Sequence, residues 1–308
     1  MNNEPPAPPA WLADERTETI RSNGLRILCR LWGRNDAPSL VLLHGLRGFS
    51  GTWRPLAAAL SSQYRLIAPD QRGRGHSDWD PDCNYYTDAY LADLEALVAH
   101  FGLGRFALLG HSMGGTTSYA YADRHPEKLT ALVIEDIAPG SSTTGAGAKR
   151  IVAEMAALPR DFASWDAARE YWRGRRPSVG AEAIEERVAE SLRLSADGRI
   201  TWRYDSEGIA RTRLHPDPAR LVDLWPLVDR LKMPTLIVRG ARSDFCPADT
   251  VAEMCRRNAR IEAVEIPDAG HYVHDDNAAP FIAKVADFLA TTSSTERRSP
   301  GCDRGSGA

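Results

Sequence analysis

One stretch, Phe106–Thr117, constrains this chain more than any other, and it reads FALLGHSMGGTT. Four apolar residues come first, then GHSMG centred on Ser112, and then small residues that begin a helix. The five central residues fit G-x-S-x-G, a sharp strand-to-helix turn that lifts a serine oxygen above a sheet. Glycines flank the serine because a Cβ there would meet the neighbouring strand and helix. The helix that follows directs its N-terminal N–H groups at any negative charge that develops near Ser112.

The composition excludes several classes of protein. A chain of 308 residues is long enough for one large α/β domain with an insertion. Its 43% apolar and 26% charged residues are ordinary for a soluble protein, and a net charge of -3 gives no argument for nucleic acid or an acidic membrane surface. The five scattered cysteines lack C-x-x-C spacing, which indicates neither disulfides nor a metal site. We see no export signal or membrane-spanning run and therefore predict a cytoplasmic protein.

Strand-like and helical segments alternate along most of the chain. The dipeptide Asn23-Gly24 between two alternating apolar runs predicts a hairpin. Continuous apolar runs are typical of strands buried on both faces of a parallel sheet. Such runs occupy residues 39–43, 65–69, 106–109, 129–137 and 234–239, and a further strand is predicted over residues 261–266.

The pattern divides the chain into four parts. Residues 1–13 are proline-rich and predict an extended or disordered leader. The α/β core is predicted over 14–137 and 232–290, because the alternation stops in between. Residues 138–231 are helical in period and predict a separate cap, and the polar tail 291–308 predicts disorder.

A serine nucleophile needs a base within hydrogen-bond reach, and the base needs a third group to hold its tautomer. In this architecture the chain order is serine, acid, histidine. His271 follows the last predicted strand and is the best-placed base, with His274 three residues on as a rival.

Two carboxylates stand at strand ends from which they could reach His271. Asp244 follows the apolar run PTLIVR, and Asp136 ends the run LTALVIEDI. We favour Asp244 as the acid and keep Asp136 as the alternative.

The order and spacing of these motifs resemble the α/β-hydrolase superfamily. The resemblance rests on GHSMGG, the His44-Gly45 loop, DQRGRGHSD, GARSD and AGH, and it covers about residues 16–290. It implies a doubly wound, mostly parallel sheet with a helical cap inserted after the sixth strand. It also implies Ser112 as nucleophile, His271 as base, Asp244 as acid, and the backbone N–H groups of Leu46 and Met113 as the oxyanion hole.

A narrower resemblance bears on the acid. The segments HGLRGFS, EDIAPGSS and AGHYVH are similar to a subgroup of small esterases and thioesterases. In that subgroup an aspartate at the Asp136 position takes part, and a serine occupies the place of Ser243. This chain carries both kinds of acid, so the third member of the triad stays open at this point.

Three further side chains are candidates for substrate contact. Arg47 stands beside the predicted oxyanion hole, where it could touch a substrate carboxylate or simply be solvated. Trp172 and Trp202 lie in the predicted cap, where tryptophans serve as packing more often than as pocket walls.

The sequence therefore predicts a serine hydrolase that cleaves a small carboxylic ester, thioester or lactone through an acyl-enzyme, without metal or cofactor. Cleavage of a C–C bond next to a carbonyl, or a biosynthetic acyl transfer, would use the same triad. A non-catalytic ligand receptor built on the same fold is the alternative from another class. The sequence indicates neither the substrate nor the oligomeric state.

Overall fold

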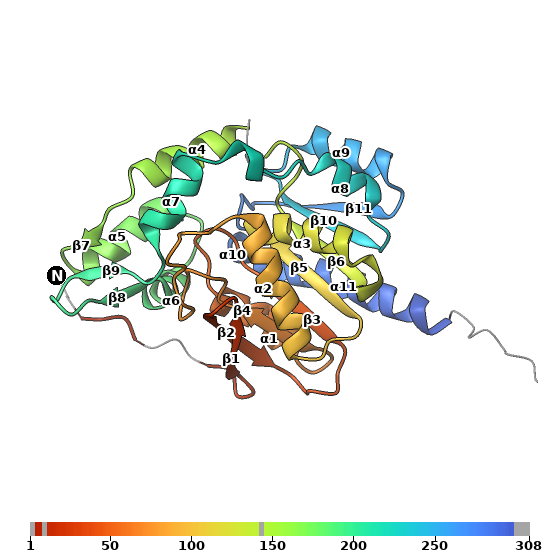
Figure 1. The fold of residues 1–308 in the computed structure, drawn as a ribbon, viewed down its shortest axis with the longest axis horizontal. Coiled ribbons are helices and arrows are strands. Elements are labelled where there is room, and N and C mark those ends of the chain that lie inside the picture. Colours follow the sequence, from red (N-terminus) through yellow and green to blue (C-terminus); the bar gives the residue numbers. More distant parts are fainter. Residues whose placement is uncertain (1–3, 8–10, 142–144, 299–308) are drawn as a thin grey trace, which may run out of the picture.

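In the described part of the chain, eight strands form one sheet in the order β1-β2-β4-β3-β5-β6-β10-β11 (Figure 1). The computed structural model describes residues 4–7, 11–141 and 145–298. β1 pairs with β2 and β2 with β4 in antiparallel fashion, and every later neighbour in the sheet is parallel. The strands are β1 (Arg16–Ser22), β2 (Leu25–Trp32), β3 (Ser39–Leu43), β4 (Arg65–Pro69), β5 (Phe106–His111), β6 (Leu129–Glu135), β10 (Thr235–Gly240) and β11 (Ile261–Ile266).

The hairpin between β1 and β2 has the predicted two-residue turn. Ser22 is paired with Leu25, so Asn23 and Gly24 alone make the connection. Both have positive φ, 47° and 83°, which a turn of this hand requires and which asparagine and glycine tolerate best.

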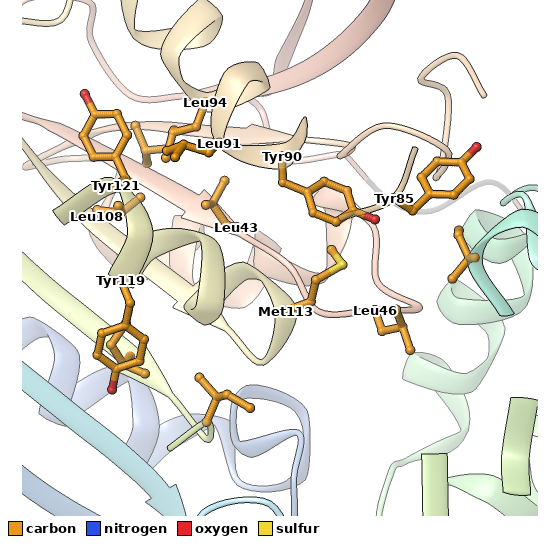
Figure 2. Close-up of a cluster of buried hydrophobic side chains, with 14 of the residues drawn as sticks. Leu43, Leu46, Tyr85, Tyr90, Leu91, Leu94, Leu108, Met113, Tyr119 and Tyr121 are labelled. Atoms are coloured by element: carbon orange, nitrogen blue, oxygen red, sulfur yellow. The ribbon is translucent and has the colours of Figure 1, made fainter. Parts of the chain in front are cut away.

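Helices cover both faces of the sheet (Figure 1). In β3, Leu40 and Leu42 face the layer formed by α1 and α11, whereas Val41 and Leu43 face the opposite layer. This two-residue alternation explains why the core strands are apolar at every position. Figure 2 shows the layer that Val41 and Leu43 face, where leucines of α2 point at the sheet. The core helices are α1 (Arg54–Leu60), α2 (Thr87–His100), α3 (Met113–Arg124), α8 (Trp225–Arg230), α9 (Ala248–Arg257), α10 (Val273–Asp276) and α11 (Ala278–Arg298), with 3-10 turns η1 (Ser50–Trp53) and η2 (Pro126–Lys128).

The segment from α4 to η3, which follows the sixth strand and is called the cap below, is not purely helical. Its strands form a small antiparallel sheet in the order β7-β9-β8, which the helical periodicity of the sequence did not indicate. Its elements are α4 (Ala146–Ala156), β7 (Asp161–Phe162), α5 (Trp165–Arg175), α6 (Ala181–Ser191), β8 (Leu192–Leu194), β9 (Ile200–Trp202), α7 (Ser206–Leu214) and η3 (Pro218–Arg220).

The boundaries of the predicted cap and tail need correction. α8 lies inside the predicted range 138–231, yet it packs on α3 and α9 of the core, with Val228 fully buried. At the other end, α11 continues to Arg298, eight residues into the tail that we predicted to be disordered from Thr291. The segment from Thr291 to Arg298 contains neither proline nor glycine, so nothing in it stops a helix. Residues 299–308 lie outside the described part.

Buried ion pairs join the cap to the core. Glu190 of α6 accepts from Arg30 of β2 at 2.8 Å and from Arg54 of α1 at 3.0 Å. Arg187 and Arg176 of the cap both pair with Asp275 of α10, at 2.6 and 3.2 Å. These bonds fix the position of the cap relative to the loop that carries His271.

None of the helices in the described part of the chain is both long enough and apolar enough to cross a membrane.

Candidate active site

Ser112 stands at the sharp turn between β5 and α3. Its backbone has φ 53° and ψ −114°, a conformation that costs energy for a residue with a side chain. A Cβ on Gly110 would lie 2.4 Å from the carbonyl oxygen of Gly114, and one on Gly114 would lie 2.4 Å from that of Leu43. The glycines of the motif are therefore required by close backbone contact, as predicted, and the turn exposes the serine oxygen to the cavity above the sheet.

His271 lies against this serine. The Ser112 hydroxyl is 2.9 Å from His271 Nε2, so it can donate its proton to the imidazole. The histidine belongs to the loop after β11, and Phe245 stacks on its ring with the centroids 4.0 Å apart. Burial lowers the pKa of His271, because the protonated ring is poorly solvated there. At neutral pH the ring is therefore in the form that accepts a proton.

Asp136 holds the other side of the imidazole. His271 Nδ1 donates to Asp136 Oδ2 at 2.8 Å. The Gly240 N–H donates to Asp136 Oδ1 at 2.9 Å, and the Ser243 hydroxyl donates to Oδ2. The aspartate is fully buried, and its backbone has φ 54°. Burial raises the pKa of Asp136, and the bonds from Ser243 and Gly240 act in the opposite direction.

The prediction that Asp244 contacts His271 is wrong. Its two oxygens instead accept from Arg150 of α4, at 2.7 Å from Nε and 2.9 Å from Nη2. This hydrogen-bonded arginine lowers the pKa of Asp244. The loop after β10 turns its fourth residue toward the cap, and it is Ser243 that faces the histidine side. The narrower esterase resemblance, which pointed to Asp136, was the better guide.

His274 does not reach the serine. Its Nδ1 lies 2.7 Å from Glu135 Oε1, and its Nε2 lies 3.0 Å from the Thr52 hydroxyl. Burial opposes protonation of this ring, but Glu135 and Asp275 raise the pKa of His274. Of the two rival histidines, only His271 is placed to act on Ser112.

One group of side chains has the spacing of metal ligands. The ligand atoms of His111, Glu135 and His274 lie within 4.8 Å of one another, and all three residues are buried. His111 Nε2 donates to the His271 carbonyl at 2.8 Å, while His274 bonds Glu135 and Thr52. These bonds explain the cluster as a support beneath the loop that carries His271.

Leu46 and Met113, the predicted oxyanion-hole residues, line the same cavity as Ser112 and His271. Leu46 follows β3, and Met113 is the first residue of α3, where helix N–H groups have no partner in the helix. In the described part of the chain, neither of the two N–H groups donates a hydrogen bond. Arg74 supports both residues, since its guanidinium donates to the Leu46 carbonyl at 3.1 Å and lies 3.3 Å from the Met113 sulfur.

The cavity above Ser112 has a volume of about 530 Å³ and is mostly apolar. The cap provides its roof through α4 and the segment around Leu221. Its remaining apolar lining comes mainly from Ile137, Phe245 and Tyr272. The face of α4 that lines it, Ala148, Ile151, Val152 and Ala156, has helical spacing and could have been found as an apolar stripe in the sequence.

The three predicted substrate-contact residues do not line this cavity. Arg47 is buried, pairs with Glu154 and lies over the ring of Trp172 at 5.8 Å. Trp202 donates to the Pro159 carbonyl at 2.7 Å, and the two tryptophans pack edge to face at 5.8 Å. Trp172 and Trp202 lie in the interior of the cap, which needs large apolar side chains to be stable. The structure therefore agrees with the interpretation of both tryptophans as packing residues.

Comparison with known proteins agrees with this architecture. The family model described as alpha/beta hydrolase fold matches residues 38–278. The chain therefore belongs to the α/β-hydrolase family, as predicted.

Two relatives and one solved structure illustrate the similarity. The chain is 30% identical to 2-(acetamidomethylene)succinate hydrolase of Mesorhizobium japonicum, over 86% of this chain and 92% of the relative. It is also 30% identical to the sn-1-specific diacylglycerol lipase ABHD11 of Mus musculus, over 84% and 83%. The crystal structure of E-2-(acetamidomethylene)succinate hydrolase superposes with a TM-score of 0.80 and 26% identity, over 90% of this chain and 99% of the other. The comparisons thus confirm the predicted fold class and the prediction of a hydrolase that acts on esters.

Proposed function

We propose that Ser112, His271 and Asp136 form the catalytic triad of a serine hydrolase for small carboxylic esters, thioesters or lactones. The observation that carries the proposal is the unbroken series of hydrogen bonds from Asp136 through His271 to Ser112, at 2.8 and 2.9 Å. Such a series activates a hydroxyl that is otherwise a weak nucleophile.

In the proposed reaction, Ser112 Oγ attacks the substrate carbonyl carbon while His271 Nε2 takes the hydroxyl proton. The N–H groups of Leu46 and Met113 donate to the oxyanion, each stabilising the transition state by roughly 3 kcal/mol. His271 then passes the proton to the leaving oxygen or sulfur, and the C–O or C–S bond breaks. Water attacks the acyl-enzyme, His271 takes its proton, and the free acid leaves. These steps need no metal or cofactor.

The cap determines which substrates fit, because α4 closes the cavity over Ser112. A cytoplasmic location remains part of the proposal, and the free thiols of Cys29, Cys83, Cys246 and Cys255 agree with it. C–C bond hydrolysis and acyl transfer would use the same three residues. A receptor would not need the strained Ser112 turn.

A panel of 4-nitrophenyl esters, thioesters and lactones of graded acyl length tests the proposal. We expect turnover of at least one class by the wild type and a loss of about three orders of magnitude or more in Ser112→Ala. Equal turnover by both proteins would show that Ser112 is not the nucleophile.

A further inference from the structure

The cavity above Ser112 carries positive charge and no negative charge. Its described lining residues include Lys149 and Arg213 but no aspartate or glutamate. Lys149 is exposed on α4, whereas Arg213 of α7 is partly buried. An otherwise apolar cavity with a few charged groups of one sign fits a ligand with an apolar portion and an opposite charge.

Arg213 has no partner in the described part of the chain. It makes no hydrogen bond or ion pair within residues 4–7, 11–141 and 145–298. Burial lowers the pKa of Arg213, because its guanidinium has lost much of its water. Two other buried arginines, by contrast, are compensated by carboxylates: Arg54 pairs with Glu190, and Arg72 pairs with Asp93. A partly desolvated cation without a carboxylate is costly unless a ligand supplies the anion.

A second uncompensated guanidinium lies close by. Arg74 is completely buried, and its acceptors are the Leu46 and Arg72 carbonyls and the Tyr90 hydroxyl, none of them a carboxylate. Tyr90, Met113 and Leu46, which Figure 2 shows near one another, all contact the Arg74 guanidinium. The charge of Arg74 acts on Arg213 and further lowers its pKa. Both cations therefore contribute positive potential to one wall of the cavity.

We propose that Arg213 binds a carboxylate carried by the substrate, so that the natural substrate is an ester or thioester with a free acid group. A guanidinium and a carboxylate form two parallel charge-assisted hydrogen bonds, and these orient the substrate as well as bind it. The inference rests on the proposed function of Ser112, because the same cavity holds both groups.

Two pairs of esters with equal chain length test the charge preference. Mono-4-nitrophenyl adipate is compared with 4-nitrophenyl hexanoate, and mono-4-nitrophenyl suberate with 4-nitrophenyl octanoate. For at least one pair we expect kcat/KM of the wild type to favour the acid by about tenfold or more, the scale of a hydrogen bond to a charged group. Arg213→Gln should remove that preference, so that kcat/KM for the acid and for the neutral ester differ by less than about threefold in this variant.

Two variants serve as controls. Arg213→Lys should keep part of the preference, because it retains the charge but not the fork of donors. Arg173→Gln removes an exposed arginine from α5, outside the cavity, and should change neither ester. A preference that survives in Arg213→Gln, or a wild type that shows none for either pair, would overturn the inference.

Calorimetry with adipate and suberate separates this inference from the proposed reaction. Binding to Ser112→Ala needs no turnover, so it is informative even if no ester is hydrolysed. We expect at least one diacid to bind Ser112→Ala at least tenfold more tightly than it binds the Ser112→Ala, Arg213→Gln double variant. Equal binding to the two variants, or no binding to either, would contradict a carboxylate site at Arg213.

Discussion

The Ser243 hydroxyl donates to Asp136 Oδ2, the same oxygen that accepts from His271 Nδ1. Ser243 belongs to the loop after β10, and the N–H of Gly240, the last residue of β10, donates to the other oxygen of Asp136 at 2.9 Å. This part of the chain therefore supplies donors that orient the acid, whereas the acid itself comes from the end of β6. The arrangement assigns different roles to the two aspartates that the sequence left as rivals.

We predict that Asp136→Asn is far more damaging than Asp244→Asn. An asparagine at 136 would present the wrong tautomer of His271 to Ser112, which costs about four orders of magnitude in kcat in a related triad. Asp244→Asn weakens one of the two carboxylate contacts of Arg150, which still pairs with Glu154 at 2.9 Å, and should cost less than about tenfold. Steady-state kinetics on one activated ester measure both. The reverse order would return the role of acid to Asp244.

Ser243→Ala should reduce kcat about tenfold. The substitution removes one of three hydrogen bonds to Asp136 but leaves those from His271 and Gly240 in place. An intermediate effect of this size is typical of a residue that orients a catalytic group. Ser243→Thr keeps a hydroxyl and should recover much of the rate. If the alanine variant retained full activity, Ser243 would be irrelevant to the orientation of Asp136.

The two neighbouring histidines should differ in what they affect. His271→Ala should lose about three orders of magnitude or more in kcat, because it removes the base. His274→Ala should keep kcat within about tenfold but lower the free energy of unfolding by about 3 kcal/mol, because Glu135 then stays buried without its charged partner. Urea denaturation and kinetics on the same samples separate the two effects. Loss of turnover in a folded His274→Ala would show that this histidine acts in the reaction.

The acid limb of the pH profile should lie below the ordinary histidine value of about 6.5. His271 must be neutral to take the serine proton, and burial lowers its pKa, so the active form persists below pH 6.5. Activity is then lost as pH falls through the pKa of the folded enzyme. The profile of kcat/KM gives this value for the free enzyme. A midpoint at or above 6.5 would show that the charge of Asp136 outweighs the burial of the ring.

Much of the fold could be predicted because local signals agree with the tertiary structure. The elbow at Ser112 and the Asn23-Gly24 turn each combine an apolar pattern with a distinct turn, and both appear where predicted. The small sheet of the cap could not be predicted. Its strands have two or three residues each, too few to show an alternation of apolar and polar residues.

The acid and the cavity wall depend on long-range contacts. Asp136 and Ser243 are 107 residues apart, and only the pairing of β6 with β10 brings them together. The sequence suggested Arg47 as a substrate contact, because its ion pair with Glu154 of α4 is visible only in the folded chain. Arg213 gave no signal in the sequence, because only the folded cap shows that it lines the cavity and has no partner among the residues that the structure describes.

Covalent labelling is the sharpest test of Ser112 as the nucleophile. Because His271 and Asp136 are proposed to activate Ser112, a fluorophosphonate should add one label to the wild type by intact mass. Ser112→Ala should take up none, and Asp136→Asn should label far more slowly. Labelling of Ser112→Ala at the wild-type rate, or a wild type that stays unlabelled while folded, would contradict the account.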